Sequence, residues 1–204
     1  MEIRPDITSN DFFEIPQYSH KPVSFNDRIQ ILKARMQEAH QTNTPRSSVV
    51  ILGGGPAGLM RAVVSLANVN PTQVIEKRDE NTKGRENIVT LLEESFELLN
   101  TYGVLAYLHE HKMIKEEKSQ RPYTGLTAIE VRIGDLEEAM KAIIHELNPN
   151  TICYSTKVIS WKSDHGKAIS LIAKSGDNEI TIDNVDLLVI AEGAKSPTNR
   201  KVRP

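Results

Sequence analysis

Three glycines, Gly53, Gly55 and Gly58, follow the apolar run 48–52 at the spacing G-x-G-x-x-G. Glycine at the first position permits a tight turn, and at the second it lets an anion approach the main chain. At the third position it lets a helix pack closely on a strand. Pro56 fits the first helical position, where no N–H is needed. Because the free N–H groups at such a helix start favour negative charge, the pattern predicts a loop that binds the diphosphate of a dinucleotide.

A carboxylate follows at the distance that this motif requires. Glu76 lies eighteen residues after Gly58, near the end of a second short predicted strand, 73–77. At that place a carboxylate accepts the hydroxyl protons of an adenosine ribose, and its charge repels a 2′-phosphate. We therefore expect an adenine dinucleotide that lacks this phosphate. A glycine-rich turn without a ligand is the alternative.

The elements that must position these residues form a βαβ unit. We expect a parallel strand over 48–52 that is buried on both faces, a helix over 56–67, and a second strand over 73–77. Asn68 and Asn70 are expected to end the helix in a left-handed conformation. The sequence thus predicts an α/β fold of the Rossmann-like kind with a parallel sheet.

The rest of the chain is expected to mix helices and strands. Apolar spacing predicts helices over 25–40, 86–101 and 136–147, with Ser24 and Asp135 capping the first and the third. After Pro149 the pattern changes, and strands are expected over 151–161, 168–174, 179–183 and 187–191, with a hairpin turn at 175–178. These later strands predict a β-meander added to the parallel sheet.

Two regions are expected along the chain. Residues 1–46 form an N-terminal extension that contains one helix, and residues 47–204 form the main domain. We expect the extension to pack on the main domain as a structural addition. An arm that contacts a partner protein is the alternative.

Composition excludes several classes of function. The 204 residues contain 25 Lys and Arg against 27 Asp and Glu, so neither nucleic acid nor an anionic membrane is an expected partner. No apolar stretch approaches the ~20 residues of a membrane span, and the N-terminus lacks a signal-peptide pattern. The single cysteine, Cys153, cannot form an internal disulfide, and no metal-binding motif occurs. We expect a cytoplasmic protein with no metal site.

Five further segments lie at separate places in the chain: Val74-Ile75-Glu76-Lys77-Arg78, Gly84-Arg85-Glu86-Asn87, Leu98-Leu99-Asn100-Thr101-Tyr102-Gly103-Val104, Val131-Arg132-Ile133-Gly134-Asp135-Leu136, and 186–196 with Arg200. In this order they resemble the FAD-binding part of the flavin-dependent monooxygenases of the aromatic-hydroxylase type, with some similarity to the MICAL monooxygenase domain. The resemblance implies a Rossmann-like FAD/NAD(P)-binding fold. It also implies FAD as the cofactor and NAD(P)H as the electron donor.

By this resemblance, the three motif glycines and Glu76 hold the ADP half of FAD. Arg85 and Arg132 lie along its diphosphate and ribityl chain, where buried phosphates need positive charge. A surface ion pair is the alternative for each arginine. Glu192 and Gly193 replace the Asp-Gly pair of the family and keep its negative charge. The full predicted site comprises Gly53, Gly55, Pro56, Ala57, Gly58, Glu76, Lys77, Arg78, Arg85, Arg132, Glu192 and Gly193; no catalytic acid or base is predicted.

The predicted function is that of the FAD-binding portion of a flavin-dependent monooxygenase, an oxidoreductase that uses NAD(P)H and oxygen on a small-molecule or protein substrate. The family's later Gly-Asp motif has no counterpart before Pro204, so we expect a fragment, a truncated chain or a degenerate member of the family. One alternative is a non-catalytic dinucleotide-binding or scaffold module that contacts a partner through residues 1–46. Another is an NAD-dependent enzyme, which the matches at Arg85, Arg132 and 191–196 disfavour.

Overall fold

A four-stranded parallel sheet forms the framework of the computed structural model, which describes residues 23–42, 45–118, 128–163 and 169–193. The strand order is β10-β1-β2-β6, formed by β1 (Val49–Leu52), β2 (Thr72–Ile75), β6 (Ile152–Cys153) and β10 (Leu187–Ile190). Leu52, the last residue of β1, pairs with Ile75 of β2 on one side and with Ile190 of β10 on the other. The carboxyl ends of these three strands therefore lie together at one edge, and the predicted α/β fold with a parallel sheet is confirmed.

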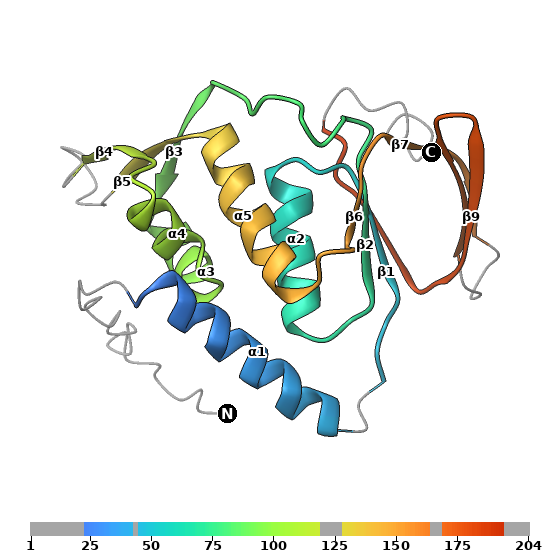
Figure 1. The fold of residues 1–204 in the computed structure, drawn as a ribbon, viewed down its shortest axis with the longest axis horizontal. Helices are drawn as coiled ribbons and strands as arrows, with labels where there is room; N and C mark the ends of the chain where they lie inside the picture. The colour runs from blue at the N-terminus through green and yellow to red at the C-terminus, as the bar shows by residue number, and fades with distance from the viewer. Residues whose placement is uncertain (1–22, 43–44, 119–127, 164–168, 194–204) are drawn as a thin grey trace, which may run out of the picture.

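Every residue of β1 is buried because the sheet is covered on both faces. Val49 and Ile51 belong to a core shared with α2 (Pro56–Ala67) and α5 (Ile133–Leu147), whereas Val50 and Leu52 belong to a second core shared with an antiparallel sheet. Figure 1 shows the resulting layers, with α2 and α5 on one side of β1 and β2 and the antiparallel strands on the other. Residues 49–52 are all apolar because they contribute alternately to both cores.

The antiparallel sheet is the predicted β-meander, and it consists of β7 (Thr156–Lys162), β8 (Ile169–Ser175) and β9 (Asn178–Val185). Gly176, with φ +59°, lies in the tight turn between β8 and β9, where the hairpin was expected. The predicted single strand over 151–161 is wrong, because β6 ends at Cys153 and β7 begins at Thr156. Ser155 between them has φ +51°, and this turn carries the chain from one sheet to the other.

The predicted helix over 25–40 is present as α1 (Phe25–Gln41). Ser24 is its N-cap, and the Ser24 hydroxyl accepts a hydrogen bond of 3.1 Å from the Asp27 N–H. Ile29 and Leu32 are buried in the core of α2 and α5, and α1 lies against that layer in Figure 1. The described part of the extension therefore packs on the main domain; residues 1–22 and 43–44 lie outside the described residues.

The predicted single helix over 86–101 is wrong. This segment forms β3 (Ile88–Leu92), the 3-10 turn η1 (Glu93–Ser95) and α3 (Phe96–Thr101), followed by α4 (Val104–Glu110) and β4 (Ile114–Lys118). β3 and β4 both pair with β5 (Ala128–Arg132) in an antiparallel sheet. The β-branched residues at the start of β3 fit a strand once a partner is present, so tertiary pairing overrides the helical spacing.

Two expected helix ends also differ from the structure. Val69, with φ +54°, takes the left-handed position after α2, whereas Asn68 is the C-cap with φ −92°. The N-cap of α5 is Arg132, and Asp135 lies in the first turn of the helix, where its carboxylate accepts a 2.9 Å hydrogen bond from the Arg132 Nε–H. The predicted helix over 136–147 therefore begins three residues earlier, at Ile133.

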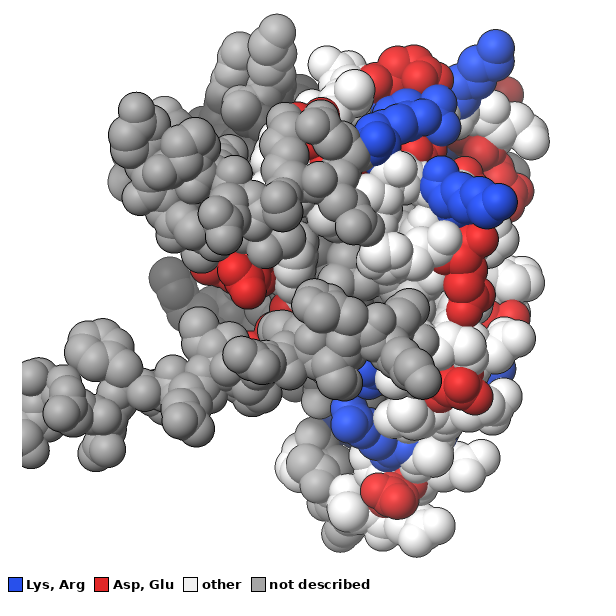
Figure 2. Space-filling model, turned by 90° about the vertical axis from the view of Figure 1, so that its left-hand side faces the viewer, with Lys and Arg blue, Asp and Glu red and all other residues white. Residues whose placement is uncertain are grey.

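Acidic and basic side chains are interspersed on the face shown in Figure 2, as the nearly balanced charge of the sequence leads one to expect. Within the described ranges, no helix combines the length and the apolar character that crossing a bilayer requires. The same ranges contain no group of three or more His, Cys, Asp or Glu side chains placed to hold a metal ion.

Candidate functional site

The glycine segment forms the junction between β1 and α2. The Gly53 N–H donates to the Ile75 carbonyl at 2.9 Å, which continues the β1–β2 ladder by one residue, and Gly53 then turns with φ +103°. Gly55 is the N-cap of α2, and Pro56 occupies the first helical position. The start of α2 is thereby directed at the carboxyl edge of the sheet, which is the geometry predicted for a diphosphate loop.

The surroundings of the three motif glycines are of two kinds. A Cβ on Gly53 would lie 2.7 Å from the Ala191 carbonyl oxygen, and a Cβ on Gly58 would collide with the Gly53 carbonyl oxygen. Both positions are closed by neighbouring backbone. A Cβ on Gly55, in contrast, would meet only the Arg85 Nη2 at 3.9 Å and the Glu137 Oε1 at 4.0 Å. Gly55 therefore has room for a Cβ and lines the pocket at the start of α2, where a ligand can approach the main chain.

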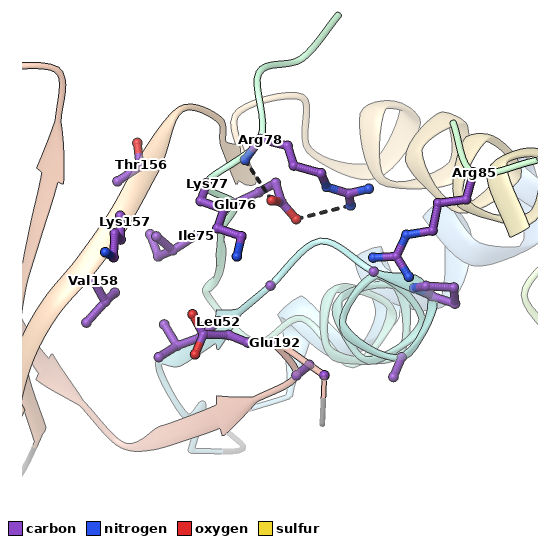
Figure 3. Close-up of a pocket in the computed structure, with 16 residues that line it drawn as sticks. Leu52, Ile75, Glu76, Lys77, Arg78, Arg85, Thr156, Lys157, Val158 and Glu192 are labelled. Carbon is purple, nitrogen blue, oxygen red and sulfur yellow. Dashed lines mark hydrogen bonds and ion pairs between the residues drawn. The ribbon is translucent and has the colours of Figure 1, made fainter. Parts of the chain in front are cut away.

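Glu76 and Arg78 together fix the peptide groups of the glycine turn. The buried Glu76 carboxylate accepts hydrogen bonds from the Gly54 N–H at 2.6 Å and from the Arg78 N–H at 2.8 Å, and the Arg78 Nη2 donates to the Gly54 carbonyl at 2.8 Å. Figure 3 shows the two side chains above the loop. Burial alone would raise the pKa of Glu76, but the hydrogen bonds from Arg78 and Gly54 and the charge of Arg78 lower the pKa below its ordinary value. Glu76 is therefore an ionised acceptor at the end of β2.

A second carboxylate, which sequence reasoning missed, lies beside Arg78 and Arg85. Glu137 belongs to α5, and only 3% of its side chain is exposed. Its Oε2 is 3.3 Å from the Arg78 Nη1, and its Oε1 is 3.8 Å from the Arg85 Nε. A signal was present, because Glu137 falls three residues before Met140 on the apolar stripe of α5. An acid on such a stripe indicates a buried cationic partner.

The turn, the end of β2 and the start of β7 enclose a pocket of about 270 Å³. Ten of the twelve predicted site residues line it, namely Gly53, Gly55, Pro56, Ala57, Glu76, Lys77, Arg78, Arg85, Glu192 and Gly193. The lining also includes residues that the sequence did not indicate: Leu52, Ile75, Thr156, Lys157, Val158 and Ala191. Sequence reasoning missed the β7 residues because only the tertiary fold brings β7 beside β2.

Two predicted residues do not line the pocket. Gly58 acts through the close packing of α2 on the turn, as described above. Arg132 instead forms ion pairs with Asp135 at 2.9 Å and with Glu86 at 3.4 Å. This is the ion pair that the sequence left open as the alternative, so a cofactor contact for Arg132 stays a prediction.

The charge of the pocket suits an anionic ligand. Its lining contains the cations Lys77, Arg78, Arg85 and Lys157 against the carboxylates Glu76 and Glu192. Glu192 follows β10 and lies across the cavity from Lys77 in Figure 3. The next residue, Gly193, has φ +87°, a conformation that favours glycine. The excess of cations in the lining and the partial positive charge at the start of α2 both favour a diphosphate in this pocket.

Comparisons with solved structures show a shared fold. The p-nitrophenol 4-monooxygenase PnpA from Pseudomonas putida DLL-E4 matches 77% of this chain at 13% identity with a TM-score of 0.62. The flavin-dependent monooxygenase PieE, solved with FAD and substrate, matches 79% at 16% identity and a TM-score of 0.65. The OxyS anhydrotetracycline hydroxylase from Streptomyces rimosus matches 76% at 19% identity and a TM-score of 0.63. The matches cover 43%, 32% and 33% of these three chains, respectively, so this chain corresponds to less than half of each.

A comparison with protein families gives the assignment. No curated protein sequence matches the chain. Residues 46–203, which include the glycine turn, Glu76, Arg85 and Glu192, match the model of a family described as FAD binding domain. This match covers more than half of the chain, and the sequence resemblance to FAD-binding proteins is confirmed. The chain belongs to the FAD binding domain family.

Proposed function

We propose that this chain is the FAD-binding part of a flavin-dependent monooxygenase that takes electrons from NAD(P)H. The observation that carries the proposal is the room at Gly55 at the start of α2, beside Arg85, in a pocket whose lining also includes Lys77 and Lys157. Support for the reaction class comes from the neighbours in fold, which include a p-nitrophenol 4-monooxygenase and an anhydrotetracycline hydroxylase. The chain spans less than half of these structures, so catalysis is proposed for the whole protein.

The described residues fit the ADP half of FAD. The diphosphate would approach Gly55 and the free N–H groups of the first turn of α2, with Arg85 beside it. The adenosine ribose would be held by Glu76, whose ionised carboxylate retains acceptor capacity beyond its bonds to Gly54 and Arg78. The flavin, when bound, supplies the redox and oxygen chemistry, and the protein orients it and excludes water.

The proposal also includes an electron donor, a substrate class, a cellular location and a partner contact. We propose NADH or NADPH as the donor, a small-molecule or protein substrate, and a cytoplasmic location. The balanced charge of 25 basic against 27 acidic residues supports neither nucleic acid nor an anionic membrane as a partner. A partner contact through residues 1–46 is also proposed, with only the helix α1 of that region described here.

Ligand titration tests the proposed cofactor. The full chain is titrated with FAD by flavin fluorescence and by calorimetry, and ADP and FMN are then added as competitors. We expect ADP to compete with FAD and FMN to fail, because the described pocket recognises the adenosine end. Tight FMN competition, or no FAD binding at millimolar protein, would contradict the assignment. Oxidation of NADH or NADPH by the FAD-loaded protein then separates an enzyme from a non-catalytic dinucleotide-binding module.

A further inference from the structure

Glu137 occupies an unusual position for a carboxylate. It is almost fully buried, yet only its Oε2 has a close partner, the Arg78 Nη1 at 3.3 Å. Its Oε1 is buried and has no hydrogen bond to any described residue, and the Arg85 Nε is 3.8 Å away, beyond hydrogen-bond distance. A buried carboxylate oxygen without a donor is costly. The structure therefore contains an acceptor that is ready to receive one more N–H group.

Arg85 is the nearest candidate to donate that group. Its side chain is 52% exposed, so it can move, whereas its main chain is held by the hydrogen bond from the Gly134 N–H to the Arg85 carbonyl at 2.9 Å. Gly134 and Glu137 both belong to α5, so one helix fixes the base of Arg85 and supplies the carboxylate. The terminal Nη2 of the same guanidinium is 3.9 Å from the place of a Cβ on Gly55. Figure 3 shows Arg85 reaching toward the glycine turn.

We infer that Glu137 is a positioning residue that holds Arg85 against the diphosphate of the bound cofactor. A guanidinium has five donors in a fixed plane, so Arg85 can donate Nε–H to Glu137 and its terminal N–H groups to a phosphate at the same time. When the anion draws Arg85 inward, the 3.8 Å gap closes and the open oxygen of Glu137 gains its donor. This inference rests on the proposed function, because it presupposes a diphosphate at Gly55.

Two other roles for Glu137 would change anion binding differently when Glu137 is replaced. If Glu137 acted on the diphosphate only through its charge, removal of that charge would strengthen anion binding. If Glu137 only supported Arg78 and the glycine turn, its loss would weaken binding whether or not Arg85 was present. Only a positioning role makes the effect of Glu137 depend on Arg85.

A double-mutant cycle tests this dependence. FAD dissociation constants are measured for the wild type, Glu137→Gln, Arg85→Ala and the double variant, all as the full chain. We expect Glu137→Gln to weaken FAD binding about tenfold in the presence of Arg85, and by less than about twofold in the Arg85→Ala background. Glu138→Gln is the matched control, because Glu138 is the exposed neighbour on α5 and contacts Tyr107 instead. That control should leave FAD affinity unchanged.

A second measurement follows Arg85 directly. The Nε–H signal of Arg85 is recorded by NMR, and its exchange with solvent is compared without ligand and with ADP. We expect ADP to slow this exchange in the wild type and to have no such effect in Glu137→Gln. Equal slowing in both proteins, or equal weakening of FAD binding in both Arg85 backgrounds, would overturn the role of Glu137 while FAD binding itself stands. Failure of the wild type to bind FAD or ADP would instead overturn the proposed function together with this inference.

Discussion

Alanine at Gly55 and at Gly58 should separate ligand binding from folding, although the two glycines lie three residues apart in one motif. At Gly58 the added methyl group has no room, because it would collide with the Gly53 carbonyl oxygen and would lie 3.3 Å from the Ala191 Cβ. At Gly55 the nearest atoms are 3.9 and 4.0 Å away and belong to the side chains of Arg85 and Glu137. The first change therefore strains the protein, and the second occupies space on the ligand side.

The cost at Gly58 follows from the rigidity of its neighbours. The Gly53–Gly54 peptide is held by the 2.6 Å hydrogen bond from the Gly54 N–H to Glu76, and Ala191 is held by a 2.8 Å hydrogen bond to the Leu52 carbonyl, so neither can move without disturbing these bonds. Overpacking of this kind costs about 1–3 kcal/mol. The better helix propensity of alanine offsets this loss of stability by at most about 1 kcal/mol. We expect Gly58→Ala to lower the free energy of unfolding by about 1–2 kcal/mol.

The stability change at Gly55 should be close to zero. Its backbone, with φ −82° and ψ 177°, is extended and accessible to alanine. Reduced flexibility of the unfolded chain stabilises by about 0.4–1 kcal/mol, which offsets the poorer N-cap preference of alanine. The methyl group, however, keeps the diphosphate from the first N–H groups of α2. Loss of one hydrogen bond to a charged group costs about 1.5–3 kcal/mol, so FAD binding should weaken roughly ten- to hundredfold.

Urea unfolding and FAD titration on the same three preparations check both statements. The expected pattern is a lower urea midpoint for Gly58→Ala alone, and weaker FAD binding with an unchanged midpoint for Gly55→Ala. FAD binding by Gly55→Ala as tight as that of the wild type would refute the placement of the diphosphate. An equal loss of stability in the two variants would refute the distinction between a packed glycine and an open one.

Three further outcomes are expected. Hydrogen bonds lower the pKa of Glu76 in the folded state below its ordinary pKa of 4.5. The stability that ionised Glu76 contributes is therefore fully present above pH 4.5 and is lost as the pH falls through the lower folded pKa. Urea midpoints should accordingly fall less steeply with pH in Glu76→Gln than in the wild type over that acid range. Val69→Gly should raise the thermal midpoint slightly. A left-handed backbone costs a β-branched residue about 1–2 kcal/mol, which glycine avoids, but the greater flexibility of glycine in the unfolded chain cancels part of this gain. Leu32→Ala should lower the free energy of unfolding by about 2–5 kcal/mol in chemical denaturation, because Leu32 of α1 is 1% exposed in the main core; an unchanged value would mean that the extension does not share the domain's stability.

The glycine turn and the parallel strands could be predicted because their signals are local. A strand buried on both faces must be apolar at every position, and Val49 to Leu52 meets this condition. A residue whose Cβ would meet another backbone segment must be glycine, as at Gly53 in the turn and Gly58 in α2. The acid at the end of the second strand, Glu76, follows from the same short unit. These features require no knowledge of the rest of the fold.

The segment 86–101 could not be predicted in this way, because its structure depends on a distant partner. Ile88 and Leu91 have the spacing of a helix face, and nothing nearby in the sequence opposes a helix. The strand β3 forms because Ile88 pairs with Arg132 and Leu92 with Ala128, some forty residues later in the chain. For the same reason, the sequence could not predict that Thr156 to Val158 line the pocket. They reach it only after the chain leaves the parallel sheet at Ser155.

Arg85 and Arg132 show that a family resemblance can predict the position of one side chain and leave that of another open. Both arginines were expected at the cofactor, and the structure brings only Arg85 to the pocket. The difference lies in their contacts, since Arg132 donates to the buried Asp135 at 2.9 Å and pairs with Glu86 at 3.4 Å, whereas the Arg85 Nε is 3.8 Å from the Glu137 Oε1, beyond hydrogen-bond distance. A guanidinium with a close hydrogen-bonded carboxylate can satisfy its charge without a ligand. Arg85 has no such close carboxylate among the described residues and lines the pocket, so of the two arginines it is the one that can donate to an anion there, with Glu137 in the positioning role proposed above.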